Sequence, residues 1–140
     1  MAYKFEKLEV WQLALEYTDL IYDLAGRLPR SEEYNLKSQL IRAATSITLN
    51  IAEGSTSQSD AEQARFLGLA IRSLTETVAC QHLIYRRHYL DNAEPLQTAY
   101  RFSEKLFAKL QAFRNSLLTK TQSSTREEPA LYEYNQDTPF

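Results

Sequence analysis

The sequence predicts an all-α protein, an antiparallel up-and-down four-helix bundle with a flexible C-terminal tail. Four long segments carry apolar side chains at spacings of three and four residues, which places those side chains on one face of a helix. The chain has only 3 Gly and 4 Pro in 140 residues, too few for the many turns of an all-β fold. Short polar connections separate the segments, and connections of this length join antiparallel neighbours. We therefore assign residues 1–119 to a single bundle domain and residues 120–140 to the tail.

The first helix is expected from about Lys7 to Leu28, because Pro29 cannot continue the hydrogen-bond ladder. A second apolar stripe widens the main one, and the narrow acidic strip that remains is interpreted as a solvated face. A helix this apolar predicts burial against more than its own bundle, and hence an oligomer. The main stripe is Val10, Leu13, Ala14, Tyr17, Leu20, Ile21, Leu24 and Leu28; the second stripe is Trp11, Leu15, Tyr22 and Ala25; the acidic strip is Glu9, Gln12, Glu16, Asp19 and Asp23.

The second helix is expected over Leu36–Gly54, and its small residues, such as Ala43-Ala44, allow a neighbouring helix to approach closely. Gly54 follows the last periodic residue and takes the left-handed conformation at no steric cost, so we expect it to close the helix. Asn50 lies beside the apolar stripe. We expect an inter-helix or capping hydrogen bond from it, and the alternatives are a polar site shared with Glu53 or simple exposure.

The third helix is expected over about Asp60–Arg87, after a capping-box pair formed by Ser59 and Glu62. The fourth helix is expected to run to about Thr119, with Pro95 in its first turn. Its apolar seam alternates strictly between three and four residues, as in a coiled coil. The core stripe of the third helix is Phe66, Leu67, Ala70, Ile71, Leu74, Val78 and Tyr85, and the seam of the fourth is Leu96, Ala99, Ser103, Leu106, Leu110, Phe113 and Leu117.

Beyond Thr119 the periodic pattern stops and the composition becomes polar, with Pro129 and Pro139. Such a segment cannot bury enough apolar surface to order itself, so a flexible tail is predicted. Within the tail, Leu131–Tyr134 forms a short amphipathic patch that could dock on a partner or on the outer surface of the bundle.

The sequence contains no recognisable catalytic or cofactor-binding motif. Cys80 and His82 are two residues apart on a helix, and His82 and His88 are six apart, so neither pair has the i, i+4 spacing of a helical metal site. We therefore expect no enzyme activity, no metal and no cofactor. The charged N-terminus lacks a signal-peptide apolar region and no long apolar run is present, which predicts a cytoplasmic protein without a membrane segment.

Basic side chains gather on the third and fourth helices of a bundle that is itself formally neutral. Residues 120–140 hold 2 of the 16 basic and 4 of the 18 acidic residues, so the bundle keeps 14 of each. This charge balance works against a strong general affinity for nucleic acid, although a local basic patch remains compatible with it. Arg101, Lys105 and Lys109 form a stripe on the fourth helix. Three alternatives stay open for this stripe: its side chains are solvated, pair with an acidic strip such as the first helix of a neighbouring subunit, or contact phosphate. The seven candidate cations for polyanion binding are Arg65, Arg72, Arg86, Arg87, Arg101, Lys105 and Lys109.

Three blocks, Phe5–Glu16, Ser38–Ser55 and Arg65–Glu76, resemble in order and sequence the 23S rRNA intervening-sequence proteins, a family of small bacterial four-helix bundles. The most specific part is NIAEG at Asn50–Gly54, so Asn50, Glu53 and Gly54 match a family motif that we expect to be structural. The resemblance implies an all-α homopentamer and no general activity. It also implies a structural relation to the accessory proteins of diversity-generating retroelements, which bind a reverse transcriptase and nucleic acid.

The chain departs from the family pattern at two places. Thr48-Leu49 stands where the family often has proline, which predicts a straighter second helix. Arg72 stands where the family often has glycine, which places a long cation where close packing would be expected.

The sequence thus leads to a first hypothesis, a non-enzymatic homo-oligomeric scaffold, pentameric by resemblance, that binds RNA or a nucleic-acid-bound protein. The alternative is a protein–protein interaction module with no nucleic-acid role, which the acidic strip favours. A third hypothesis, a small-molecule or metal enzyme, rests only on the ability of bundle cores to hide a site.

Overall fold

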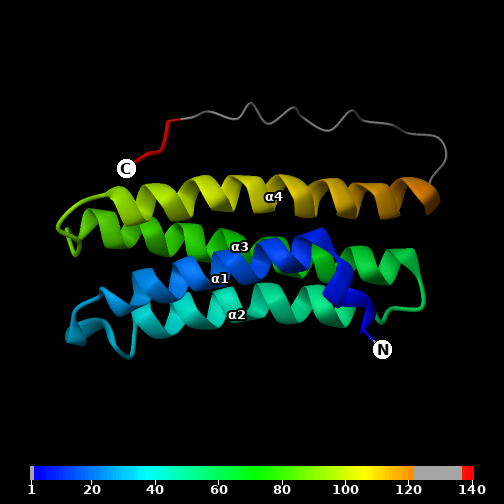
Figure 1. The fold of residues 1–140 in the computed structure, drawn as a ribbon, viewed down its shortest axis with the longest axis horizontal. Coiled ribbons are helices and arrows are strands. Elements are labelled where there is room, and N and C mark those ends of the chain that lie inside the picture. The colour runs from blue at the N-terminus through cyan, green and yellow to red at the C-terminus, as the bar shows by residue number, and fades with distance from the viewer. Residues whose placement is uncertain (1, 122–136) are drawn as a thin grey trace.

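A computed structural model describes residues 2–121 and 137–140 and shows a bundle of four long helices (Figure 1). The predicted all-α fold class is confirmed. A 3-10 turn precedes the first helix, so that helix begins at Glu9 and not at Lys7. The elements are η1 (Lys4–Lys7), α1 (Glu9–Gly26), η2 (Arg30–Glu32), α2 (Leu36–Gly54), α3 (Asp60–Arg86) and α4 (Glu94–Thr121).

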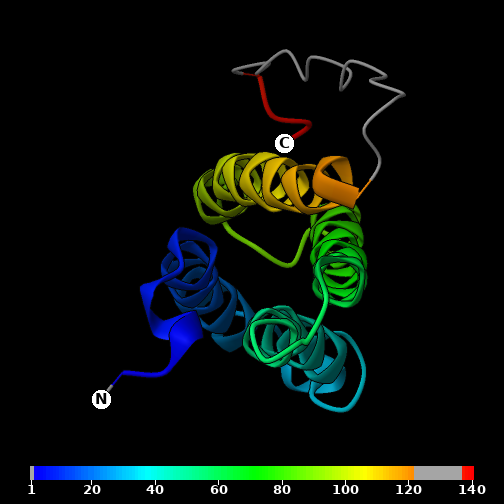
Figure 2. The ribbon, with the colours of Figure 1, turned by 90° about the vertical axis from the view of Figure 1, so that its right-hand side faces the viewer.

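The four helices form a closed ring in cross-section. Each helix packs against the one before and the one after it in the chain, and α4 returns to pack against α1 (Figure 2). The most extensive packing joins α2 to α3. Among the described residues, no helix has the length and apolar content needed to cross a membrane.

The main predicted stripes of α1, α3 and α4 make most of the core, and one of their members is exposed. The seam of α4 is buried throughout except for half-buried Phe113. Tyr85, however, was predicted in the core stripe of α3 and is 44% exposed. Thr77 and Gln81 are buried on α3 instead, because the inward face of this helix keeps its spacing of three and four through two polar residues.

The helix α2 ends at Gly54 as predicted, but the reason is different. No described glycine has a positive φ, so Gly54 does not use the left-handed conformation. A Cβ atom at Gly54 would lie 2.8 Å from the Cβ of Phe66 on α3. Glycine therefore allows the close approach of α2 to α3 at this end of the bundle.

A buried polar cluster joins α1 to the helix diagonally across the ring. The Thr77 hydroxyl donates to the Leu74 carbonyl oxygen at 2.6 Å, so its oxygen accepts from the Tyr17 hydroxyl at 2.7 Å. The Gln81 amide donates to the Tyr17 oxygen at 2.8 Å, and the Phe102 ring of α4 stacks on the Tyr17 ring. Burial raises the pKa of the Tyr17 phenol above its usual range, so the side chain stays neutral.

Residues 122–136 lie outside the described part, so the flexible tail predicted there stays a prediction, as does docking by Leu131–Tyr134. The last four residues, 137–140, are described and lie over the first half of α4 (Figure 1). Phe140 packs against the aromatic side chains of α3 and α4.

We predict that Gly54→Ala lowers the free energy of unfolding by about 1–3 kcal/mol, because the new methyl group would collide with Phe66. Urea denaturation at one fixed protein concentration measures the loss. Gly26→Ala is the matched control, since nothing lies within 4 Å of a Cβ at Gly26. Equal stability of the two variants would show that the α2–α3 contact tolerates a side chain.

We also predict that Tyr17→Phe costs about 1–3 kcal/mol of stability, because the Gln81 amide loses its buried acceptor. Thermal unfolding followed by circular dichroism measures this cost. Tyr22→Phe, on the same helix at a side chain that is 52% exposed, should stay within about 0.5 kcal/mol of the wild type. A Tyr17→Phe variant as stable as this control would contradict an energetic role for the cluster.

Candidate polyanion-binding surface

Three of the seven candidate cations share the outward face of α3. Arg65, Arg72 and Arg86 are separated by multiples of seven residues, and all three are exposed. The Arg65 guanidinium carbon lies 4.7 Å from the centre of the Phe66 ring. Because Arg72 points to solvent, the long cation at this departure from the family pattern occupies no close helix contact. Arg87, also exposed, caps the end of α3.

The other three follow one another along α4 at spacings of four residues. Arg101 and Lys105 are exposed, and the Lys105 ammonium lies 5.9 Å from the centre of the Phe102 ring. Lys109 lies at the seam with α1, where its ammonium is 3.3 Å from a carboxylate oxygen of Glu9. Glu104, the acid between Arg101 and Lys105 in sequence, is half-buried, and burial raises the pKa of its carboxyl.

The structure spreads the seven cations along the bundle and does not gather them into one cluster. Tyr85 and Tyr100 both contact Phe140, so the end of α3 and the start of α4 lie side by side. Arg86 and Arg101 follow these tyrosines directly and lie in the same part of the bundle. Arg65 lies near the opposite end of α3. The arrangement is therefore two basic stripes along adjacent, antiparallel helices.

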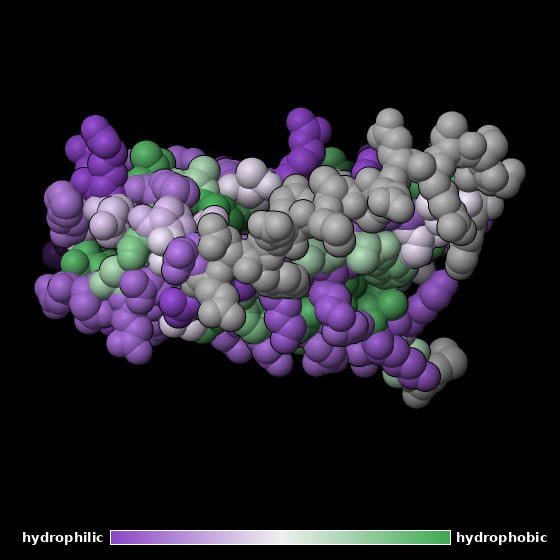
Figure 3. All heavy atoms as spheres, turned by 90° about the horizontal axis from the view of Figure 1, so that it is seen from above, coloured by the Kyte–Doolittle hydropathy of each residue, from purple (hydrophilic) through white to green (hydrophobic). Residues whose placement is uncertain are grey.

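Most of this charge is not neutralised locally. Within the described residues, Lys109 is the one member of the seven with a carboxylate partner at ion-pair distance. From Asp60 to Thr121, the span of α3, α4 and their connection, the chain holds nine basic and six acidic residues. Seen from the α4 side, hydrophilic side chains predominate along both long edges of the molecule, with hydrophobic ones between them (Figure 3). The α3–α4 half of the bundle therefore presents a net positive surface.

The acidic strip of α1 is solvated, as predicted, since all five of its members are exposed. Two of its carboxylates have partners inside this chain, because Asp23 pairs with Arg27 at 3.1 Å and Glu9 pairs with Lys109 of α4. The sequence suggested pairing of these charges across a subunit boundary, and the Glu9–Lys109 pair shows the same complementarity within one bundle. Both side chains are about half exposed, so the pair contributes little to stability.

The second stripe of α1 is only partly covered by the bundle. Leu15 is 40% exposed and Tyr22 is 52% exposed, whereas Ala25 is buried. Trp11 is half-buried, and its ring meets the Phe5 ring of η1 edge-on at 4.6 Å. Large apolar groups thus line the outside of α1 beside its exposed acids.

The family-motif residues are held by hydrogen bonds and close packing. The Asn50 amide donates to the backbone and hydroxyl oxygens of Ser46, and the Ser73 hydroxyl of α3 donates to the same Ser46 hydroxyl. The hydrogen bonds of Asn50 therefore stay within α2, and the expected inter-helix bond is made by its partner Ser46 with Ser73. Glu53 is exposed, and it lies outside these hydrogen bonds.

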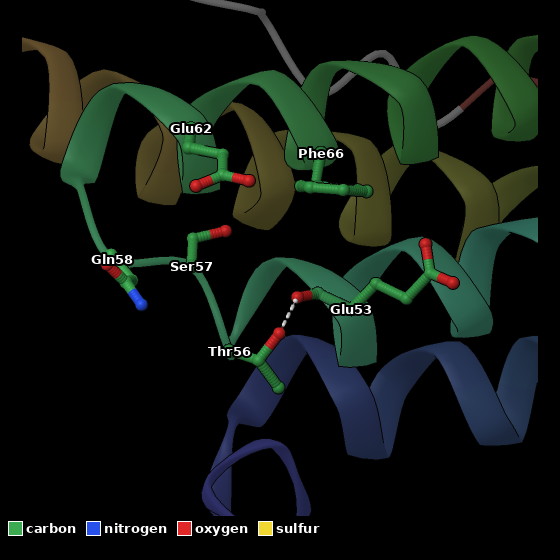
Figure 4. Close-up of a pocket in the computed structure, with 6 residues that line it drawn as sticks. All are labelled: Glu53, Thr56, Ser57, Gln58, Glu62 and Phe66. Atoms are coloured by element: carbon green, nitrogen blue, oxygen red, sulfur yellow. Dashed lines mark hydrogen bonds between the residues drawn. The ribbon is translucent and has the colours of Figure 1, made fainter.

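Glu53 lines an open pocket of about 460 Å³ where α2 passes into α3 (Figure 4). Glu62 and Phe66 line it from α3, and the loop residues between the helices complete it. The Ser57 hydroxyl oxygen is buried there without a hydrogen-bond partner in the described structure. Asn50 does not line this pocket, and its amide binds Ser46 instead.

The remaining candidates for chemistry lie apart. Cys80 is buried, and burial together with the Glu76 carboxylate raises the pKa of its thiol. His82 packs on Phe140, and His88 sits in the α3–α4 connection with a φ of 57°. In the part of the chain that the structure describes, no three His, Cys, Asp or Glu side chains are placed to hold a metal ion.

Sequence reasoning missed two groups of residues. Thr77 and Gln81 continue the three-and-four spacing of Ala70 and Leu74, so a pattern search that admitted polar residues would have placed them in the core. Gln97, which holds Phe140 in place, gives no sequence signal, because the contact joins residues 43 positions apart.

Residues 6–116 match the sequence pattern of the family described as 23S rRNA-intervening sequence protein. The fold is similar to the crystal structure of a protein with unknown function from the S23 ribosomal protein family of Bacteroides thetaiotaomicron VPI-5482, with a TM-score of 0.55. The two sequences are 24% identical, and the similarity covers 81% of this chain and 98% of that chain. No curated protein matches the sequence.

Proposed function

This chain belongs to the 23S rRNA-intervening sequence protein family, and from that premise we propose that it is a non-enzymatic, cytoplasmic homo-oligomeric scaffold. Its proposed ligand is RNA or a nucleoprotein complex, bound by the basic stripes of α3 and α4. The observation that carries the proposal is the set of six candidate cations with no carboxylate partner among the described residues.

The oligomer is supported by the outer face of α1. Leu15 and Tyr22 leave large apolar groups in solvent, and a second copy of the bundle would cover them. Five subunits is the number that the family resemblance implies.

Repetition would make a weak basic surface effective. The cations are spread along two helices, so each copy offers only a few phosphate contacts. In an oligomer, the contacts made after the first are effectively intramolecular, so several copies bind one polyanion far more tightly than a single copy does. A single-stranded RNA long enough to span two or more subunits is therefore the preferred probe.

The second candidate function is a protein–protein interaction module without a nucleic-acid role. The Glu9–Lys109 pair favours it, because it shows that α1 acids and α4 cations are complementary. If the exposed cations contact a neighbouring subunit, reversing their charge would disrupt the oligomer. In that case the wild-type protein would not bind RNA.

We predict that labelled single-stranded RNA binds the oligomer with an affinity that falls steeply with salt. Reversing one cation on each helix, in an Arg72→Glu/Lys105→Glu variant, should weaken binding by about tenfold or more. Fluorescence anisotropy at several salt concentrations measures both effects. Arg30→Glu/Arg42→Glu is the matched control, since it makes the same charge change at exposed residues outside the stripes.

The mass of each variant separates the two functions. The first function predicts that Arg72→Glu/Lys105→Glu keeps the oligomer mass and loses RNA. A loss of oligomer mass in that variant would favour the interaction module. Absence of RNA binding by the wild type even at low salt would rule out the nucleic-acid scaffold.

A further inference from the structure

The last residue of the chain occupies an aromatic site on the outside of the bundle. The Phe140 ring lies 5.0 Å from the His82 ring, 5.2 Å from the Tyr85 ring and 5.7 Å from the Tyr100 ring, measured between ring centres. The Gln97 amide donates to the Phe140 carbonyl oxygen at 3.0 Å. We name His82, Tyr85, Gln97 and Tyr100 the aromatic seat.

The seat selects a ring and a carbonyl oxygen together. His82 and Tyr100 meet the Phe140 ring edge-on, the arrangement that aromatic pairs favour. The Gln97 amide donates to the backbone carbonyl oxygen of the residue that carries the ring. A peptide must therefore present an aromatic ring and this carbonyl oxygen in the same relative position. Phe140 is half-buried and packs against the hydrophobic core, whereas the other three residues of the segment contribute little apolar surface.

Two features of the docked segment lower the conformational cost of this contact. Pro139 fixes its own φ and restricts the residue before it, which reduces the conformational freedom lost on docking. The backbone N–H of Phe140 donates to the Thr138 hydroxyl at 3.3 Å, which closes a local turn. The backbone of the Thr-Pro-Phe sequence is therefore restricted by its own residues, and it loses less conformational entropy on docking.

The aromatic seat belongs neither to the helix core nor to the candidate polyanion-binding surface. Tyr85 faces outward at 44% exposure and takes no part in the helix core. None of the four seat residues belongs to the seven candidate cations. An outward tyrosine and histidine on neighbouring turns of α3, opposite Tyr100 of α4, are explained by the segment that they hold.

The chain is long enough to reach its own seat. Gln97 and Thr121 are 24 residues apart on α4, which is about 36 Å of helix. The 16 residue steps from Thr121 to Asp137 span at most about 58 Å when fully extended. The segment is thus a tethered ligand, for which effective concentrations are on the order of millimolar.

We propose that the aromatic seat is a peptide-binding site for a Thr-Pro-Phe segment, with the aromatic ring as its anchor, and that residues 137–140 of the same chain are its resident ligand. A peptide supplied by another molecule must compete with this tethered segment. Emptying the seat therefore opens it to the same peptide in solution. The proposal does not depend on RNA binding.

The test uses the full chain with Phe140→Ala, which leaves the seat intact and removes its anchor. The probe is a fluorescein-labelled hexapeptide with the sequence of residues 135–140, Asn-Gln-Asp-Thr-Pro-Phe, followed by anisotropy. We expect saturable binding to Phe140→Ala and at least tenfold weaker binding to the wild type. The same hexapeptide with alanine in place of phenylalanine should not bind.

Two further variants, each made in the Phe140→Ala background, test whether the peptide binds at the aromatic seat. Gln97→Ala should weaken binding several-fold through loss of the carbonyl contact, and Tyr100→Ala should abolish it. Tyr34→Ala is the matched control, because Tyr34 is an almost fully exposed tyrosine far from the seat in sequence, and binding should be unchanged. Circular dichroism checks that each variant keeps its helix content.

Three results would overturn the proposal: no peptide binding to Phe140→Ala, equal binding to Phe140→Ala and wild type, or equal binding of the alanine peptide. Unlabelled wild-type chain is added last as a competitor. If the wild-type chain displaces the probe from Phe140→Ala as strongly as free peptide does, residues 137–140 bind the seat of a neighbouring copy. The proposal that they occupy the seat of their own chain would then be wrong.

Discussion

The Tyr17 hydroxyl is the point on which the register of this bundle depends. It donates to Thr77 and accepts from Gln81 inside a largely apolar core, and the Tyr17 ring stacks on Phe102. A single side chain of α1 thus touches α3 across the ring and α4 beside it. Apolar packing tolerates small shifts of one helix along another, whereas buried polar atoms lose their partners when a helix slides. The cluster therefore fixes which turns of the three helices face one another.

The helices themselves could be predicted because their signals are local. Spacings of three and four gave all four helices, and the Ser59 hydroxyl accepts from the Glu62 N–H as the capping pattern indicated. The errors concern contacts between helices. Gly54 was explained by its own backbone, yet what requires glycine is Phe66 of α3, whose position depends on how the two helices pack. Tyr85 was placed in the core because hydrophobic character alone was counted.

The sequence predicted which basic residues are exposed, but it did not predict how they lie relative to one another. The sequence identified the exposed cations, because charged side chains on an amphipathic helix point to solvent. It could not show that Lys109 pairs with Glu9 of the same chain or that the cations spread into two stripes. Gln97 and Phe140 lie 43 residues apart in the sequence, and the spacing of apolar residues gives no information about such a contact.

The surface of the bundle has two unlike halves, and this division underlies the proposed function. The α1 side carries four acids and no lysine or arginine over residues 9–26, with Leu15 and Tyr22 exposed among them. The α3–α4 side is basic. The uncovered apolar groups of α1 suit the molecule to self-association through that side, and self-association would then repeat the basic stripes for a polyanion. The central claim is therefore the oligomer. Light scattering coupled to size-exclusion chromatography, on the full chain at micromolar concentration, tests it most directly. We expect a mass several times the 16.2 kDa of one chain, falling toward that of a single chain when Tyr22→Glu places a charge on the outer face of α1. A wild-type mass of one chain would contradict the account.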